Sequence, residues 1–264
     1  MSYDRERLWF GQNGFHIRFE WGRHGARTAA ERGDVLILAD VLCFGTAVAT
    51  AVERGATIFP CGPHEDTVAL AARWGAQIAV ARQDVPQRGR FSLSPQTFLE
   101  AEAGTRVVLP SLNGATCTRY GSRVPRLYVG GLVNAKAIAE AAARTAAAAN
   151  ATITVLACGE RWLNPTEDGE LRFAAEDYLA AAAILSYLPP SLKRSPEAAV
   201  CQAGFASLSG RLTEMLRGCG SGVELIARGF PEDVEHSAQL DVYNAVPLLV
   251  DGVRLESETT APSA

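Results

Sequence analysis

An aspartate at the end of an apolar run is the first feature of this chain that could do chemistry. Residues 34–39 lead into Asp40, and Gly45-Thr46-Ala47 follow shortly after it. The apolar run predicts a buried parallel strand, and open α/β sheets bind ligands beyond the carboxyl ends of such strands. A carboxylate at this point suits a metal ion or an anionic ligand. The alternative, which the spacing leaves open, is that Asp40 only caps the next helix.

Small and polar residues follow three later strands of the predicted sheet. Asn113-Gly114 comes after the strand at 106–109, Gly130-Gly131 and Asn134 after 127–129, and Cys158-Gly159-Glu160 after 153–157. Backbone amides at a helix start attract anions. One such loop is also typical of a plain capped turn, but three in succession favour a cradle for phosphate or sulfonate oxygens.

Carboxylates are the second group of candidate residues in the predicted site. Glu160, Glu176 and Asp177 join Asp40 as candidates. Glu176 and Asp177 are adjacent in an apolar helix, so we expect only one of them to share the apolar face and the other to be solvated. Hard oxygen ligands of this kind suit Mg²⁺, which binds a few carboxylates together with water and substrate phosphate. Lewis-acid activation of a bound phosphate ester would follow.

Cysteine and histidine give weaker signals. Cys43 precedes a helix start, where a thiolate nucleophile would be favoured, but no arginine follows at a phosphate-loop spacing. A buried structural thiol is therefore the favoured interpretation, and the same holds for Cys158 and Cys219. The four histidines show no metal-ligand spacing; His24 is the one placed to approach the site.

Composition excludes several classes of protein. The chain has 264 residues, is 48% hydrophobic and 20% charged, and carries a net charge of −4, which argues against nucleic acid as a partner. No signal-peptide pattern and no membrane-spanning stretch is evident. The six cysteines form no CxxC pair, so neither a zinc site nor a secreted disulfide framework is expected. A cytoplasmic location follows as the expectation, and the alanine-rich helices make a homo-oligomer plausible.

Strands and helices alternate along the chain. Strands are expected at residues 15–20, 34–39, 57–60, 76–81, 106–109, 127–129 and 152–157. Helices are expected at residues 26–32, 46–54, 64–74, 95–101, 113–120, 134–149, 171–188, 196–217, 221–228 and 231–240, with an acidic loop at 160–170. This order predicts an α/β fold of three layers, with helices on both faces of a mostly parallel sheet.

The domain prediction is a single α/β domain over residues 1–250, which could consist of two intimate halves. Residues 246–255 are expected to form a short edge strand or ribbon. Residues 251–264 are the C-terminal segment, and 257–264 a frayed tail.

In its motifs the chain resembles the 2-phosphosulfolactate phosphatase family. The resemblance covers roughly residues 16 to 250 and rests on the order and spacing of many short motifs rather than on any one. They are Phe19-Glu20-Trp21-Gly22, Asp40-Val41-Leu42, Gly45-Thr46-Ala47, Leu93-Ser94-Pro95, Leu109-Pro110-Ser111-Leu112-Asn113-Gly114, Gly131-Leu132-Val133-Asn134-Ala135, Cys158-Gly159-Glu160-Arg161-Trp162, Ala175-Glu176-Asp177, Ser221-Gly222-Val223-Glu224-Leu225 and the run through Asp233, Asp241, Val246 and Pro247.

The resemblance implies a Mg²⁺-dependent acid phosphatase. Its reaction would convert 2-phospho-3-sulfolactate to 3-sulfolactate and phosphate on the route to coenzyme M. The mechanistic hypothesis places Mg²⁺ on Asp40 with Glu160 or Glu176, and catalysis on Asp40, Glu160 and Arg161. The substrate would be held by Thr46, Arg82, Asn113, Gly114 and Asn134, with Arg82 or Arg161 neutralising charge or binding the sulfonate.

The chain departs from the family pattern at Cys43-Phe44-Gly45 and at Ala81-Arg82-Gln83-Asp84. Two alternatives therefore stay beside the main hypothesis. One is a hydrolase on the same scaffold that acts on a related small phosphate ester. The other is a non-catalytic protein that binds anions without turnover.

Overall fold

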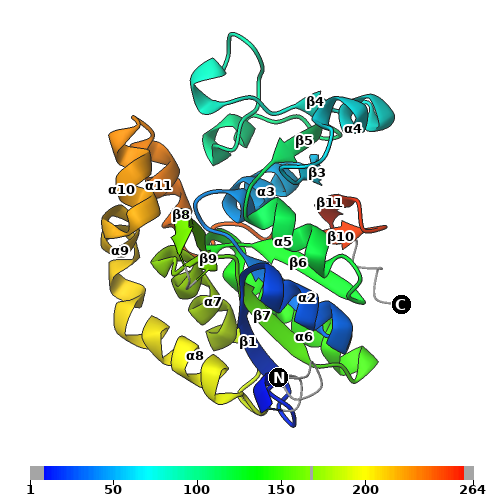
Figure 1. Cartoon of the computed structure of the whole chain (residues 1–264), viewed down its shortest axis with the longest axis vertical. Coiled ribbons are helices and arrows are strands. Elements are labelled where there is room, and N and C mark those ends of the chain that lie inside the picture. Colours follow the sequence, from blue (N-terminus) through cyan, green and yellow to red (C-terminus); the bar gives the residue numbers. More distant parts are fainter. Residues whose placement is uncertain (1–8, 167–168, 259–264) are drawn as a thin grey trace.

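A nine-stranded sheet with helices on both faces forms the centre of the protein (Figure 1). The computed structural model describes residues 9–166 and 169–258. The strand order is β1-β7-β2-β6-β10-β11-β3-β5-β4, and β8 and β9 form a separate hairpin. This architecture confirms the predicted three-layer α/β fold. Within the described ranges, no helix is both long and apolar enough to cross a membrane.

The strands are β1 (Ile17–Trp21), β2 (Val35–Ala39), β3 (Thr57–Cys61), β4 (Gln77–Ile78), β5 (Arg106–Pro110), β6 (Arg126–Gly130), β7 (Ile153–Ala157), β8 (Glu160–Thr166), β9 (Gly169–Arg172), β10 (Pro247–Val250) and β11 (Arg254–Ser257). The α-helices are α2 (Gly22–Arg32), α3 (Phe44–Glu53), α4 (Thr67–Trp74), α5 (Gly114–Gly121), α6 (Ala135–Ala149), α7 (Ala175–Tyr187), α8 (Pro196–Leu208), α9 (Leu212–Gly218), α10 (Gly220–Ala227) and α11 (Pro231–Ser237). Short 3₁₀ turns are η1 (Arg82–Asp84), η2 (Pro95–Phe98), η3 (Leu132–Asn134) and η4 (Ser209–Arg211).

The carboxyl ends of four parallel strands lie side by side in the sheet. Trp21 of β1 lies opposite Ala157 of β7, and Ala157 lies opposite Ala39 of β2. Ala39 in turn lies opposite Gly130 of β6. The segments that follow these strands therefore leave the sheet side by side, which is how residues distant in sequence come together beyond β2.

The C-terminal hairpin lies inside the sheet. β10 pairs antiparallel with β6 through Leu248 and Tyr128, and β11 pairs antiparallel with β3 through Leu255 and Ile58. The predicted ribbon is confirmed, but its edge position is wrong, because the hairpin joins the two groups of parallel strands. Burial of Leu248 and Leu255 in the core holds it there. The frayed tail predicted at 257–264 is placed too early, because Ser257 ends β11 and the Glu258 N–H donates to the Val246 carbonyl over 2.9 Å. Residues 259–264 of that prediction lie outside the described residues, and the single domain over 1–250 stays a prediction.

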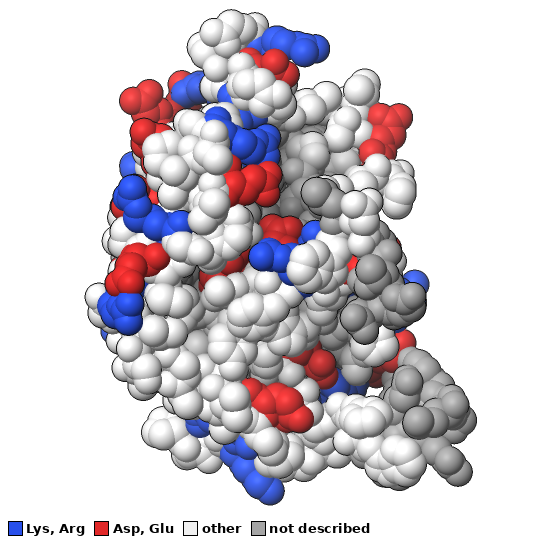
Figure 2. Space-filling view, turned by 60° about the vertical axis from the view of Figure 1, so that its left-hand side comes forward, with Lys and Arg blue, Asp and Glu red and all other residues white. Residues whose placement is uncertain are grey.

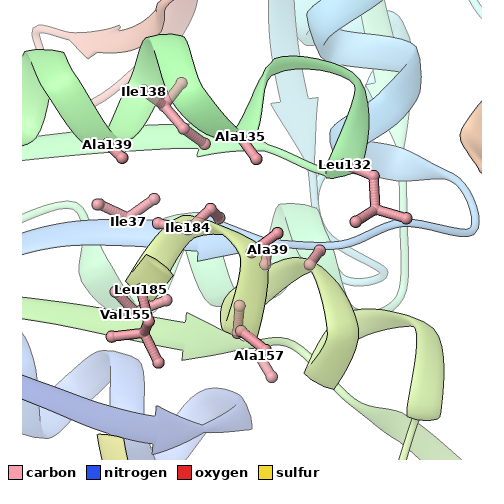
Figure 3. Close-up of a cluster of buried hydrophobic side chains, with 14 of the residues drawn as sticks. Ile37, Ala39, Leu132, Ala135, Ile138, Ala139, Val155, Ala157, Ile184 and Leu185 are labelled. Carbon is pink, nitrogen blue, oxygen red and sulfur yellow. The ribbon is translucent and has the colours of Figure 1, made fainter. Parts of the chain in front are cut away.

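The apolar run of β2 is buried on both faces because its side chains alternate between two cores. Ile37 and Ala39 pack with α6 and α7 on one face, where Figure 3 shows them beside Ile138 and Ile184. Leu36 and Leu38 pack on the other face against residues of α2, α3 and α5. A strand enclosed in this way gives Asp40 a fixed position at its end.

Several predicted elements differ from the structure. The acidic loop at 160–170 is instead the β8–β9 hairpin, in which the Arg172 guanidinium lies 5.4 Å from the centre of the Trp162 ring, a cross-strand contact that supports pairing. The following helix consequently begins at Ala175. The helix predicted at 196–217 is divided at η4, which contains Gly210, a residue that weakens helices. Of the strand predicted at 76–81, only Gln77–Ile78 forms β4, and residues 95–98 form a 3₁₀ turn.

Candidate active site

Asp40 is buried where β2 ends and α3 begins. Its Oδ1 accepts a hydrogen bond of 3.1 Å from the backbone N–H of Phe44, the first residue of α3. A second backbone N–H, that of Gly114, also points to this carboxylate. Asp40 therefore does cap the start of α3, as one of the two interpretations predicted. The residues packed around Asp40 show that capping is only part of its environment.

Other carboxylates surround Asp40. The pKa of Asp40 is raised to about 7, chiefly by burial and then by the charges of Glu160 and Glu176, against the opposing effect of the two N–H groups. Three acidic side chains, Asp40 after β2, Glu160 of β8 and Glu176 of α7, are therefore close enough for their charges to interact. Such a group favours a bound cation, since a positive charge relieves both the desolvation and the mutual repulsion.

Glu160 is held by the segment that precedes α5. Asn113 donates its side-chain Nδ2–H to Glu160 Oε2 over 2.9 Å, and the backbone N–H of Arg161 donates to the same oxygen over 3.3 Å. Burial raises the pKa of Glu160, and the charge of Glu176 adds to this effect. The structure thus brings together three predicted residues, Asn113, Glu160 and Asp40.

Glu176 and Asp177, in the first turn of α7, are both buried. The expectation that one of them is solvated is wrong, because α7 packs on the sheet with one side and on α8 with the other. Asp177 Oδ1 accepts the Val41 N–H over 2.8 Å, and its Oδ2 accepts the Gly159 N–H over 2.9 Å. Asp177 therefore joins the segments that follow β2 and β7, and so positions Asp40 and Glu160.

Two predicted substrate-binding side chains are occupied by backbone contacts. Thr46 Oγ1 donates to the Val41 carbonyl over 2.9 Å. Asn134 Oδ1 accepts the Gly131 N–H over 3.1 Å, and its Nδ2 donates to the Ala245 carbonyl over 3.1 Å. Both side chains are buried and shape the loops around Asp40. Their predicted contact with substrate stays a prediction.

The two candidate arginines lie in different surroundings. Arg82 forms an ion pair of 2.8 Å with buried Asp233, whose other oxygen accepts a hydrogen bond from Ser94. Cys43 lies beside this pair, and burial raises the pKa of its thiol strongly, which does not suit a nucleophile. Arg161 instead lines a cavity and donates from Nη2 to the Leu112 carbonyl over 2.6 Å.

A cavity of about 390 Å³ opens next to Glu160. Its walls come from the start of α2, from α5 and from the β8–β9 hairpin, and they include Asn113, Glu160, Arg161 and His24. Three arginines lie among its lining residues, namely Arg23, Arg27 and Arg161. The size suits a small ligand. Figure 2 shows acidic and basic side chains together around a hollow on the side of the molecule that carries α8–α11.

Sequence reasoning missed several residues near this site. Arg23 and Arg27 follow the motif Phe19-Glu20-Trp21-Gly22, and their i, i+4 spacing on a helix start was the available signal. Ser221, which the sequence analysis named only within a motif, is the second residue of α10, and its hydroxyl is buried with no hydrogen-bond partner among the described residues. Cys219 is close enough to Glu176 for that charge to help raise the pKa of its thiol, so Ser221 lies near the carboxylates.

The donor set fits a hard divalent cation in its chemistry, although no preformed cage exists. Across residues 9–166 and 169–258, no three His, Cys, Asp or Glu side chains are already arranged to hold a metal ion. Mg²⁺ typically takes one or two carboxylates and completes its shell with water and substrate phosphate. Buried Asp40 and partly buried Glu160, whose charges repel each other, offer that smaller set.

Comparison with known proteins shows which family the chain belongs to. The family model of 2-phosphosulpholactate phosphatase matches residues 24–252, which include every carboxylate described above. The chain belongs to this family of phosphatases. A protein of Symbiobacterium thermophilum named probable 2-phosphosulfolactate phosphatase is 25% identical over 241 residues, covering 83% of this chain and 93% of that protein. Proteins of the same name from Carboxydothermus hydrogenoformans and Deinococcus radiodurans are 28% and 29% identical, each covering 83% of this chain and 87% and 89% of their own lengths.

Membership of the phosphatase family agrees with the arrangement around Asp40. Asp40, Asn113, Gly114, Glu160 and Glu176, all expected at the site, gather beyond the end of β2. The loops after the three strands come together, because Gly114 and Gly131 lie close to Asp40 and Gly159 shares the Asp177 carboxylate with Val41. Their role as a cradle for phosphate or sulfonate oxygens stays a prediction. Arg82 stands apart, engaged with Asp233.

Proposed function

We propose that this chain is a Mg²⁺-dependent phosphatase that hydrolyses 2-phospho-3-sulfolactate to 3-sulfolactate and phosphate. The observation that carries the proposal is the group formed by buried Asp40 and Glu176 with partly buried Glu160, beside a cavity whose lining includes three arginines. Buried acids without a cation are unfavourable, and a phosphate ester with further negative charges suits a basic cavity. The family match and the names of the relatives agree with this chemistry.

Asp40, Glu160 and Glu176 would have different roles in the reaction. Asp40 and Glu160 would hold the metal ion through carboxylate oxygens. The N–H of Phe44 orients the Asp40 carboxylate, and Asn113 orients that of Glu160. When bound, Mg²⁺ supplies Lewis-acid stabilisation of charge on the phosphoryl oxygens. Glu176, near both carboxylates, accepts a proton from the attacking water.

The reaction is balanced without a covalent enzyme intermediate. The oxygen of water forms a bond to phosphorus while the bond between phosphorus and the C2 oxygen of the ester breaks. The proton of the water passes to Glu176 and from there to solvent, and the leaving oxygen takes a proton from solvent water to become the hydroxyl of 3-sulfolactate. Arg161, which lines the cavity, counters the negative charge of the phosphoryl group during this step.

The cellular setting is part of the proposal. We place the protein in the cytoplasm, because its six cysteines are buried free thiols that suit a reducing compartment. The product 3-sulfolactate would enter a coenzyme M-type pathway. A homo-oligomer remains a prediction from the alanine-rich helices.

Phosphate release tests the proposal. The purified chain is incubated with 2-phospho-3-sulfolactate and with a panel of small phosphate esters, in Mg²⁺ and separately in excess chelator. We expect release that requires Mg²⁺ and is fastest with 2-phospho-3-sulfolactate. Faster release from another ester would support the hydrolase alternative. No release from any ester, with sulfolactate still raising the melting temperature, would overturn the catalytic claim in favour of an anion-binding protein.

A further inference from the structure

Two arginines on α2 line the cavity without a part in the hydrolysis proposed above. Arg23 and Arg27 are four residues apart, so their side chains lie on the same face of the helix. Both belong to the cavity wall that also contains Glu160 and Arg161. A cavity lined both by two cations of α2 and by the Glu160 carboxylate offers two distinct binding environments.

The two arginines differ in their present partners: Glu170 pairs with Arg23, whereas Arg27 contacts an aromatic ring. Arg23 forms an ion pair with Glu170, and both side chains are substantially exposed. The Arg27 guanidinium lies 4.7 Å from the centre of the Tyr120 ring, and no carboxylate of the described residues lies within ion-pair distance of it. An exposed guanidinium held over an aromatic ring has its orientation set by stacking while its N–H donors stay free.

The start of α2 adds positive character to the cavity wall that contains Arg23 and Arg27. The first turn contains no acidic side chain, and the N-cap Trp21 makes no side-chain hydrogen bond to it. The first N–H groups of the helix are therefore not neutralised by a side chain of the cap. The cavity is lined by Trp21, Gly22 and Arg23 at this point.

We propose that Arg27, together with Arg23, binds the sulfonate of the substrate, the oxyanion that is not hydrolysed. With its phosphoryl group at Asp40 and Glu160, a three-carbon substrate that also occupies the cavity directs its remaining anions toward α2. Planar guanidinium groups match the oxygens of such an anion. This assignment rests on the proposed phosphatase function and makes Arg27 a residue that sets substrate specificity.

Substrate analogues and one arginine variant test the assignment. Arg27→Gln is assayed for kcat/KM with 2-phospho-3-sulfolactate and with 2-phospholactate, which keeps the phosphate and carboxylate but lacks the sulfonate. Loss of one charge-assisted contact should lower kcat/KM about 10- to 100-fold for the first substrate. The value for 2-phospholactate should change less than about threefold. Arg23→Gln should show the same selectivity with a smaller loss, because Glu170 competes for Arg23.

Arg73→Gln is the matched control. Arg73 is an exposed arginine whose guanidinium lies 5.0 Å from the centre of the Trp74 ring, on α4 and outside the lining of this cavity. It should leave kcat/KM for both substrates unchanged. Melting temperatures of all variants should match the wild type, because the side chains are on the surface.

The outcomes distinguish sulfonate binding by Arg27 from the phosphatase function itself. An equal loss with both substrates in Arg27→Gln would overturn sulfonate recognition while leaving the phosphatase function intact. A selective loss with the phosphate ester of 2-hydroxyethanesulfonate, which has no carboxylate, would confirm that the sulfonate is the group bound. If that ester is unaffected while 2-phospholactate loses rate, Arg27 binds the carboxylate and the assignment is wrong. A wild-type chain that hydrolyses none of these esters would contradict the proposed function itself.

Discussion

Gly114 lies so close to Asp40 that a Cβ atom at position 114 would stand 2.5 Å from Asp40 Oδ2. The same atom would overlap the ring of Phe44, which is fully buried. The glycine at the start of α5 is therefore what allows the segment after β5 to approach the carboxylate. Without that approach, the N–H of Gly114 could not reach Asp40.

Gly114→Ala should damage the site more than the fold. Displacing Asp40 and Phe44 should cost about 1–3 kcal/mol of unfolding free energy and lower kcat by about 100-fold, since small displacements at a reacting centre have effects of that size. Urea unfolding and phosphate release measure the two. Gly218→Ala, in α9 with nothing within 4 Å of the added atom, is the control and should retain full activity. Unchanged kcat in Gly114→Ala would contradict the placement of Asp40 at the reacting centre.

Asp177 acts through the loops that it joins. In Asp177→Asn one side-chain oxygen becomes an NH₂ group, so either the Val41 N–H or the Gly159 N–H loses its acceptor. A buried unsatisfied donor costs about 1–3 kcal/mol. We expect a lower melting temperature and a reduced kcat with little change in KM, because Asp177 positions Asp40 and Glu160 rather than binding substrate. A raised KM with unchanged stability would show that Asp177 contacts the substrate directly.

The raised pKa of Asp40 predicts how pH and Mg²⁺ act on stability. The folded-state pKa is about 7, above the ordinary value of 3.8, so the folded protein binds the extra proton between these values. The stabilisation from that proton is present at low pH and is lost as pH rises through about 7. The slope should be at most about 1.4 kcal/mol per pH unit for one proton.

Mg²⁺ competes with that proton, so its stabilising effect should grow as pH rises. Melting curves from pH 5.5 to 8, with and without Mg²⁺, should diverge toward the upper end for the wild type. In Asp40→Asn the two curves should stay close together across the whole range. A Mg²⁺ effect that is independent of pH in the wild type would argue against Asp40 as a ligand.

The ion pair between Arg82 and Asp233 connects the segment after β4 to α11. Both side chains are largely buried, so removing one partner leaves an uncompensated charge at a cost of about 3–5 kcal/mol. We expect Arg82→Gln and Asp233→Asn each to be strongly destabilised. The double variant should be less destabilised than the sum of the two, as chemical denaturation of all four proteins would show. Additive effects would mean that the two side chains do not depend on each other.

Local patterns were enough to predict the core of the site. The apolar run before Asp40 identified β2 because alternation between two buried faces requires apolar residues at every position. Glycine-containing segments that follow neighbouring strands indicated that Gly114 and Glu160 belong to the site, because neighbouring parallel strands end on the same side of the sheet. These features depend on residues close in sequence, so the sequence alone could predict them.

Features that depend on distant contacts were missed. The burial of Glu176 and Asp177 depends on α8, which covers the side of α7 that faces away from the sheet. Helical periodicity in the sequence does not reveal a helix that is buried on both sides. The hairpin at β10 and β11 enters the sheet through pairings with β6 and β3, more than 100 residues away. Similarly, Arg82 is engaged by Asp233, at the far end of the sequence, and not by a neighbour.

Phosphate release by Asp40→Asn, measured against the wild type in saturating Mg²⁺, tests the central claim most directly. Asp66→Asn is the matched control, because Asp66 caps α4 through the N–H groups of Val68 and Ala69 and lies outside the carboxylate group. Hydrolysis of 2-phospho-3-sulfolactate should fall at least about 100-fold in Asp40→Asn and stay at the wild-type level in Asp66→Asn. Equal activity in both variants would show that Asp40 only caps its helix and would contradict the proposed site.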